Sequence, residues 1–216
     1  VQATQKIVQI LENTLQDDLV ICLISGGGSA LMVSPASGIA LAELQELTSR
    51  LLACGAIINE INTLRKHLDR VKGGQLARLA APARIATLIL SDVVGDPLDV
   101  IASGPTVPDP TTYNDAYAIL EKYDLVKHIP QSIQDTLERG RQGRLPDTPK
   151  PGDFIFERVE NVIVGSNSQA AQAAISQAEL EGFQPLLLTT SLQGEARQAG
   201  RWLASFSMQL WTACAS

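Results

Sequence analysis

The sequence predicts an α/β fold built on a mostly parallel sheet, and three observations support this class. Four short apolar runs, at 20–24, 84–90, 161–164 and 185–188, have the length and composition of buried strands. Each run ends in small polar residues and precedes a segment with helical periodicity, which is the order of parallel strands joined by right-handed crossovers. Hydrophobic residues make up 45% of the 216 residues and charged residues 19%, as in folded domains rather than disordered chains.

The bulk composition narrows the classes of function. A net charge of −6 without a basic block argues against a nucleic-acid partner, and no apolar run reaches the ~18 residues of a membrane span. Cys22, Cys54 and Cys214 are far apart and lack metal-binding spacing, so we expect reduced thiols in a cytoplasmic protein. The chain begins at Val1 and its two methionines are internal, so we expect a piece of a longer protein.

A helix is predicted at 2–14. The strand at 20–24 follows it, and we expect this strand to be buried on both faces. The strand runs into a glycine-rich turn. The turn consists of Ser25, Gly26, Gly27, Gly28 and Ser29. Backbone without side chains can approach a ligand closely and point its N–H groups at an anion, so the turn predicts a phosphate or carboxylate site. A tight connection without a ligand is the alternative. The turn lacks the lysine of a P-loop, and Leu31 replaces a glycine of both the dinucleotide fingerprint and the nucleophile elbow.

Three helices are predicted between this turn and the second strand, at 41–54, 57–72 and 76–80. In the second of them, apolar residues recur every three or four positions up to Gly73 and Gly74, which is typical of an amphipathic helix. Its polar face carries Lys66 and Lys72. These lysines either form ion pairs with neighbouring carboxylates or point at the anion of the glycine turn.

The second strand, 84–90, is followed by two carboxylates, Asp92 and Asp96. Open parallel sheets place functional residues at this end of a strand. A carboxylate there can hold Mg²⁺ or accept a proton from a substrate hydroxyl. The alternative is that both side chains serve turns, in which Asp before Pro is common.

The second half of the chain begins with a stiff loop at 101–110, which contains three prolines and a glycine. Helices are expected at 113–123, 130–140, 169–181 and 195–203. Segment 139–152 is predicted to be a surface excursion and 154–157 an edge strand, while the tail from 206 to 216 gives no clear signal.

All four predicted strands end in small polar side chains, at 25–29, 91–92, 165–168 and 189–191. Because the carboxyl ends of parallel strands meet at one edge of a sheet, we expect these four segments to lie together. Helix N-termini and hydroxyl groups at that edge favour a phosphorylated ligand.

Several motifs together resemble the glycerate 2-kinase family, whose members are sometimes labelled hydroxypyruvate reductase. They are LISGGGSAL (23–31), EINTLRKHL (60–68), VKGGQLA (71–77), LSDVVGDP (90–97), IASGPTVPDPTT (101–112), GSN (165–167) and GEAR (194–197). The resemblance implies a Rossmann-like, three-layer α/β/α domain with a mostly parallel sheet, incomplete at both ends in this chain. It also implies ATP-dependent phosphorylation of D-glycerate to 2-phosphoglycerate with Mg²⁺, in a cleft between this domain and a smaller C-terminal one.

The resemblance also suggests residue roles. Lys66 and Lys72 would neutralise charge, and Asp92 would orient the attacking hydroxyl or hold Mg²⁺ together with Asp96. The anionic group would be bound by a set of small residues, namely Ser25, Gly26, Gly27, Gly28, Ser29, Ser103, Gly104, Thr106 and Asn167. The partner would be a small molecule, without nucleic acid or membrane, and the family is compatible with a homodimer.

The chain departs from the family at both ends, because family members extend before Val1 and beyond Ser216. We therefore expect 1–204 to be part of the larger domain, 205–216 to be a tail that does not match the family, and the C-terminal domain to be absent. We expect little kinase activity from this chain alone, and an apolar patch where the sheet lacks its cover. Two other functions remain open, a hydroxypyruvate reductase and a non-catalytic domain that binds a small anion or nucleotide.

Overall fold

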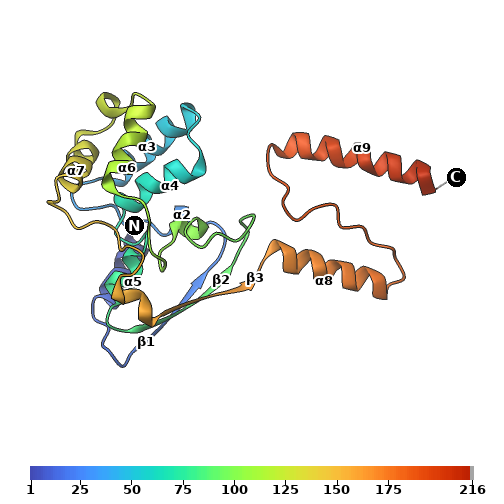
Figure 1. The fold of residues 1–216 in the computed structure, drawn as a ribbon, viewed down its shortest axis with the longest axis horizontal. Coiled ribbons are helices and arrows are strands. Elements are labelled where there is room, and N and C mark those ends of the chain that lie inside the picture. Colours follow the sequence, from blue (N-terminus) through green and yellow to red (C-terminus); the bar gives the residue numbers. More distant parts are fainter. Residues whose placement is uncertain (215–216) are drawn as a thin grey trace. The chain divides into compact units, whose positions relative to one another are not determined.

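The structure is a computed structural model that describes residues 1–214 (Figure 1). The chain divides into two compact units, one formed by 1–91 and 97–165 and the other by 92–96 and the residues from 166 onward. Among the described helices, none is both long enough and apolar enough to cross a membrane.

The elements of the first unit are α1 (Gln2–Leu11), β1 (Leu19–Ile24), α2 (Gly28–Leu31), α3 (Leu41–Ala53), α4 (Ile58–His67), α5 (Gln75–Ala80), β2 (Arg84–Leu90), η1 (Ile101–Ser103), α6 (Tyr113–Lys122), η2 (Val126–His128), α7 (Gln131–Arg141), η3 (Phe154–Arg158) and β3 (Val159–Gly165). The second unit contains α8 (Asn167–Leu180) and α9 (Ala196–Cys214).

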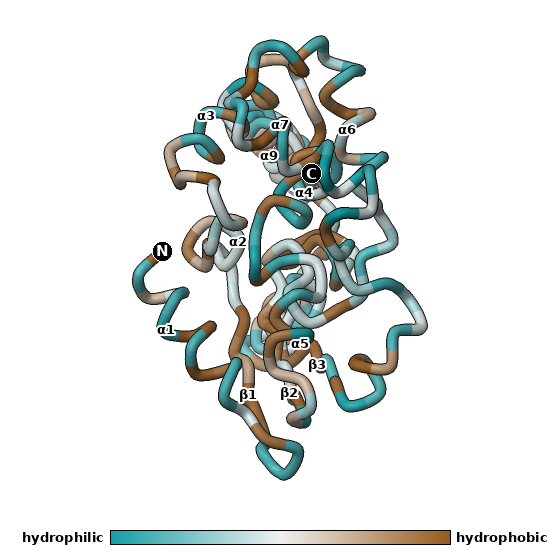
Figure 2. Tube along the Cα trace, turned by 90° about the vertical axis from the view of Figure 1, so that its left-hand side faces the viewer, coloured by the Kyte–Doolittle hydropathy of each residue, from teal (hydrophilic) through white to brown (hydrophobic). Residues whose placement is uncertain are grey.

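The three described strands form one parallel sheet in the order β1-β2-β3 (Figure 1). Val20 pairs with Ile85 and Ile85 with Val159, so the buried positions of the strands are in register. The strands are hydrophobic along much of their length, as Figure 2 shows. This arrangement confirms the predicted α/β class with a parallel sheet.

One face of the sheet packs against helices. Leu11 of α1 and three residues of α5 form a buried cluster with Ile85 of β2, and Phe156 of η3 packs against the same cluster. The apolar stripe of α5 (Leu76, Ala77 and Ala80) faces the sheet because those positions recur with helical spacing.

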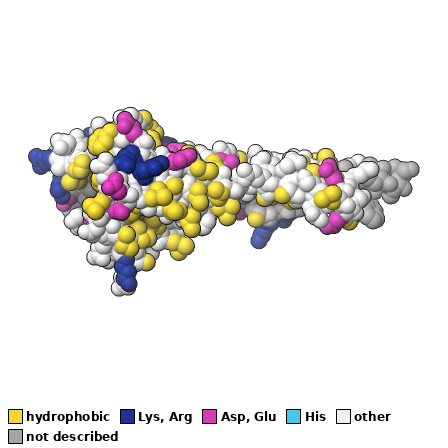
Figure 3. Space-filling view, turned by 90° about the horizontal axis from the view of Figure 1, so that it is seen from below, with side chains coloured by type: hydrophobic (Ala, Val, Ile, Leu, Met, Phe, Trp, Pro, Cys, Tyr) yellow, Lys and Arg dark blue, Asp and Glu magenta, His cyan; other side chains and the backbone are white. Residues whose placement is uncertain are grey.

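The opposite face of the sheet is exposed, so the expectation that β1 is buried on both faces was wrong. Leu19, Ile21 and Leu23 are 59%, 61% and 78% exposed, and Val162 and Val164 of β3 are exposed as well. We call these five residues the apolar sheet face; Figure 3 shows a broad group of hydrophobic side chains on the side of the molecule seen from below. Because every residue of β1 is apolar, the sequence favours a strand that is covered on both faces. In the structure, helices cover only one face of the sheet. The expectation of an apolar patch is confirmed.

A second core lies among helices. Residues of α3, α4, α6 and α7 form a cluster whose members include the fully buried Leu51, Leu64, Leu120, Ile133 and Leu137. The α6 helix begins with a capping box, in which the hydroxyl of Thr112 accepts from the amide of Asp115 at 3.3 Å. The cluster holds α3 and α4 beside the glycine turn.

Two boundaries in the first unit differ from the sequence expectation. The helix expected at 57–72 ends at His67, because the carboxylate of Asp69 accepts from the amides of Val71 at 2.9 Å and Ser34 at 3.1 Å and so offers the backbone an alternative to the helix. The edge strand expected at 154–157 is the 3₁₀ helix η3, whose first turn is capped by the side chain of Asp153.

One expectation in the second unit was wrong, and one segment without a clear sequence signal is helical. Segment 185–188 is not a strand, and its three leucines are 47–64% exposed. A strand needs a neighbouring strand to satisfy its backbone, and apolar composition alone does not supply one. The tail from 206 is helical as far as Cys214, as the continuation of α9. Residues 215–216 lie outside the described residues.

Candidate functional site

The glycine turn occupies the carboxyl end of β1. Gly27 has φ 81°, a left-handed conformation that suits glycine, and it caps the N-terminus of the short helix α2. The backbone amides of Gly26, Gly27 and Ser29 have no acceptor among the described residues. The turn therefore has three N–H groups available to an anionic ligand.

The loop that contains η1 packs directly on this turn. A Cβ added to Gly28 would lie 3.0 Å from the Cβ of Ala102, so the close approach requires glycine. The hydroxyls of Ser29 and Ser103 share a hydrogen bond at 2.7 Å, and Ser103 also donates to Asn62 Oδ1 at 3.1 Å. Ala102, Ser103 and Gly104 all have positive φ, at 51°, 61° and 61°. Two of these are not glycine, and strain of this kind is often found at functional sites.

The segment that follows α4 joins the same cluster through its backbone. Gly73 donates from its amide to the carbonyl oxygen of Ser103 at 2.9 Å, and Gly74 donates to that of Gly104 at 2.7 Å. A Cβ on Gly73 would lie 2.9 Å from the Cβ of Lys66. Three segments far apart in sequence, 25–29, 72–74 and 101–104, are thus brought together.

Lys72 is buried in this cluster. Its ammonium lies 3.6 Å from the carboxylate of Asp69 and donates to the carbonyl oxygen of Met32 at 2.5 Å. Burial lowers the pKa of Lys72 and raises the pKa of Asp69, and their mutual attraction partly offsets both effects.

Lys66 and Thr106 anchor neighbouring loops. Lys66 is 4% exposed and lies 3.4 Å from the carboxylate of Asp109 and 3.6 Å from that of Asp99. Thr106 is 1% exposed and donates to Asn161 Oδ1 of β3 at 2.6 Å. In this structure both side chains make internal contacts that hold the 99–109 loop in place.

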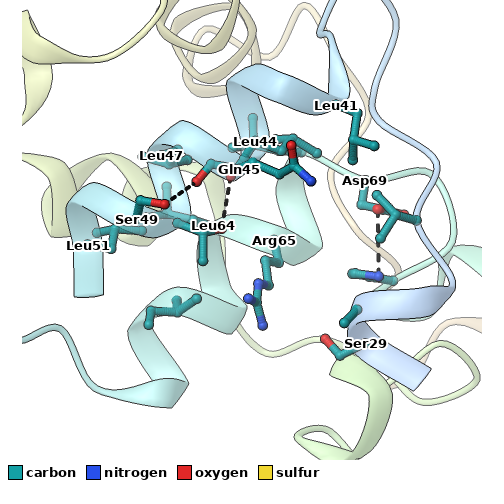
Figure 4. Close-up of a pocket in the computed structure, with 16 residues that line it drawn as sticks. Ser29, Leu41, Leu44, Gln45, Leu47, Ser49, Leu51, Leu64, Arg65 and Asp69 are labelled. Carbon is teal, nitrogen blue, oxygen red and sulfur yellow. Dashed lines mark hydrogen bonds and ion pairs between the residues drawn. The ribbon is translucent and has the colours of Figure 1, made fainter. Parts of the chain in front are cut away.

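A pocket of about 420 Å³ lies beside the turn, between α2, α3 and α4 (Figure 4). Leu44 and Leu47 of α3 line one side of it, and Ser29, Arg65 and Lys72 also line it. Its volume falls within the ~300–1,000 Å³ of small-molecule sites. The pocket therefore combines an apolar wall with the cationic side chains of Arg65 and Lys72, beside Ser29 of the glycine turn.

Arg65 is the residue of this site that the sequence did not single out. Its guanidinium makes no hydrogen bond or ion pair with any described residue, although burial is sufficient to lower its pKa. A half-buried cation without a counterion is unusual and favours an anionic ligand. Arg65 directly precedes Lys66 in the sequence, and periodicity could not tell which of the two side chains faces the pocket.

The remaining candidates belong to the second unit. Asp92 is exposed, and its carbonyl oxygen accepts from the side-chain amide of Asn167 at 3.4 Å. Asp96 has φ 52°, in a turn where its amide donates to the carbonyl oxygen of Val93 at 3.1 Å. The described residues contain no group of three or more His, Cys, Asp or Glu side chains placed to hold a metal.

Comparisons with known proteins support a family assignment. A family model described as "Domain of unknown function (DUF4147)" matches residues 1–138. The "Glycerate 2-kinase" of Pyrococcus horikoshii is 45% identical over 203 residues, which are 94% of this chain and 45% of that protein. A relative from Agrobacterium vitis that carries a hydroxypyruvate reductase name is 44% identical over 208 residues, which are 96% of this chain and 45% of that protein.

A solved structure supports the same family assignment. The crystal structure of glycerate kinase from Thermotoga maritima superposes with a TM-score of 0.81 and 42% sequence identity, over 95% of this chain and 46% of that one. The chain thus spans less than half the length of each of these three relatives. These similarities confirm the fold class and the family resemblance that the motifs indicate.

Proposed function

Because this chain belongs to the DUF4147 family, we propose that it forms part of an ATP-dependent kinase that converts D-glycerate to 2-phosphoglycerate. The observation that carries the proposal is the pocket beside the glycine turn, which is lined by Ser29 of the turn and by Arg65, whose charge no described residue compensates. Residues 1–204 would be part of the larger domain of that kinase. The spacing of the cysteines favours a cytoplasmic location.

The proposed role of the pocket is to hold one anionic group. The amides of Gly26, Gly27 and Ser29 would donate to a carboxylate of D-glycerate or to a phosphate of ATP. Arg65 would add a charged, two-pronged donor, and Lys72 would contribute charge from the pocket wall. Phosphoryl transfer requires mainly positioning and charge neutralisation, and these groups supply both.

Asp92 is the proposed contact with Mg²⁺ or with the attacking hydroxyl. Mg²⁺ binds through one or two carboxylates plus substrate phosphates, and the exposed carboxylate of Asp92, with Asp96 four residues on, fits such a site. The bound ion would neutralise phosphate charge. Asn167 would fix the backbone of Asp92 through its hydrogen bond to that carbonyl oxygen.

Calorimetric titration of this chain tests the proposal. D-glycerate or ATP with Mg²⁺ should bind saturably, and Arg65→Met should raise the Kd about tenfold, which corresponds to ~1.4 kcal/mol. Arg50→Met is the matched control, because Arg50 lies on α3 in an exposed ion pair with Glu46 outside the pocket. Equal binding by the two variants would contradict the proposed role of Arg65.

The same titration separates the kinase from the reductase. The dinucleotide fingerprint fails at Leu31, so we expect no binding of NADH and no absorbance change on adding hydroxypyruvate. NADH binding with hydroxypyruvate-dependent oxidation would favour the reductase instead. A non-catalytic binding domain would be favoured if this chain binds D-glycerate or ATP while the full-length Thermotoga maritima relative releases no ADP from the two substrates.

A further inference from the structure

A second cavity, of about 280 Å³, lies on the first unit between α5, α6 and α7. Three of its lining residues are arginines, namely Arg70, Arg78 and Arg139, and His67 lies beside them. We call it the arginine cavity. We propose that it binds a small phosphate-bearing anion, at a site separate from the pocket beside the glycine turn.

The charge of the arginine cavity is only partly compensated by the protein. Arg78 donates to two neutral acceptors, the carbonyl oxygen of Asp147 at 2.8 Å and Gln75 Oε1 at 3.0 Å. The carboxylates of Asp153 and Asp147 attract its charge, but neither forms an ion pair or hydrogen bond with it. Arg139 makes no side-chain hydrogen bond or ion pair with the described residues. In a chain with a net charge of −6, three arginines around one cavity are a local exception.

The carboxylates of Asp69 and Glu12, near the cavity, already have hydrogen-bond or ion-pair partners in the protein. Asp69 lines it, but its oxygens accept from two backbone amides and lie near Lys72. Arg70 does have a carboxylate partner, Glu12 at 2.9 Å, yet both side chains of that pair are more than 40% exposed. An exposed ion pair contributes little and exchanges readily, so Arg70 is available to a stronger anion.

The wall of the cavity is rigid. His67 is buried, with Nδ1 2.8 Å from the carbonyl oxygen of Thr63 and Nε2 3.0 Å from Asp147 Oδ1. The ring of Tyr113 packs edge-on against His67 with the ring centroids 4.8 Å apart. Because these contacts fix the wall on which Arg78 rests, the guanidinium groups do not need to be ordered entirely by the ligand.

The chemistry of the cavity favours a phosphate group. Guanidinium groups pair with phosphate oxygens through two parallel N–H donors, and three of them match the charge of a phosphate dianion or a diphosphate. The volume lies near the lower limit of ~300 Å³ for ligand sites, which favours a small molecule over a whole nucleotide. Inorganic phosphate, pyrophosphate and short phosphorylated acids share this chemistry.

Titration with pyrophosphate, followed by calorimetry and by the NMR signal of His67, tests the proposal. We expect saturable binding, a shift of the His67 signal, and a Kd raised about fivefold or more by Arg139→Gln. Arg144→Gln is the matched control, because Arg144 is an exposed arginine three residues beyond the end of α7 and does not line the cavity. It should leave the Kd within about twofold of the original.

Further binding measurements distinguish the arginine cavity from the glycine turn, and phosphate ligands from carboxylate ligands. Arg65→Met should leave pyrophosphate binding to the arginine cavity unchanged. If pyrophosphate binding is instead lost in Arg65→Met and retained in Arg139→Gln, the anion binds at the glycine turn and the proposal is overturned. Malonate should bind more weakly than pyrophosphate, and equal binding would overturn the preference for phosphate. Absence of saturable binding up to about 10 mM would also overturn it.

Discussion

At the residue scale, ion pairs with little exposure dominate the region around the glycine turn. Lys66 with Asp109 and Lys72 with Asp69 are almost fully buried; the first ion pair joins two distant segments of the chain, and the second lies within one segment. Burying charges is costly, and removing one partner of such a pair leaves the other uncompensated. Arg65 differs from both lysines because no described carboxylate meets it. That contrast is the main reason to assign the anion to Arg65 as well as to the lysines.

Asp147 should make stability depend on pH in an acidic interval. Burial alone would raise its pKa, but the hydrogen bond and charge of His67, the amide of Thr148 and Lys150 outweigh burial and lower the pKa to about 2. An unfolded aspartate titrates near ~3.9, so the stabilisation is complete above that pH and is lost as the pH falls towards 2.

Urea unfolding of the original protein and of Asp147→Asn measures this effect. The difference in unfolding free energy between the two should be constant above pH ~4 and should shrink between pH ~4 and ~2. Asp135→Asn, which changes an exposed carboxylate on α7, should show no comparable narrowing. A difference for Asp147→Asn that stays constant across the acidic interval would contradict the assignment.

At the element scale, the close contact between α2 and η1 decides the shape of the site. It brings Ser29 to 2.7 Å from Ser103 and leaves no room for a side chain at position 28. The strained backbone of 102–104 is held by hydrogen bonds from the amides of Gly73 and Gly74. The geometry of the site therefore depends on α2, on η1 and on the segment that follows α4. A change at one of these elements should therefore be felt at the others.

Gly28→Val tests this coupling. The added side chain would meet Ala102 at a distance shorter than normal contact, so we expect a loss of about 1–3 kcal/mol in unfolding free energy. The same variant should weaken binding of D-glycerate or ATP. Gly200→Ala in α9 is the control, because nothing lies within 4 Å of the added Cβ, and it should not destabilise the protein. Unchanged stability of Gly28→Val would show that η1 is free to move.

At the scale of the whole molecule, the apolar sheet face is the dominant exposed feature. Leu19, Ile21 and Leu23 alternate along β1, and the register sets Ile21 beside Ala86 and Leu23 beside Leu88 of β2. A contiguous apolar surface of this kind is usually covered in a stable protein. In solution we expect this chain to associate through it.

Sedimentation velocity measures that association. The average mass should rise with protein concentration, and Leu23→Thr should reduce the rise, since threonine keeps the strand preference but removes apolar area. Leu180→Thr is the control, because Leu180 is an equally exposed leucine on α8, outside the sheet. A monomer at all concentrations, or an equal effect of the two substitutions, would contradict this expectation.

Sequence patterns were sufficient to predict the three parallel strands of the sheet, most helices, the glycine turn and the family, although two further expected strands, at 154–157 and 185–188, did not form. Strands and turns of this kind are encoded locally, by apolar runs such as 20–24 and by glycine at positions 26–28, so periodicity and motif are sufficient to find them. It also indicated that Ser29 and Ser103 belong to one site, through a resemblance rather than through spacing.

The distribution of charges around the site could be read only from the folded chain. Contacts between residues far apart in the chain decide the ion pairs of Lys66, the hydrogen bond from Lys72 to Met32 and the grouping of three arginines around the second cavity. The same holds for segment 185–188 and for the uncovered face of β1, because a strand pairs, and a face is buried, only where another element meets it. Pairing and burial are properties of neighbours in space, which a linear pattern does not specify.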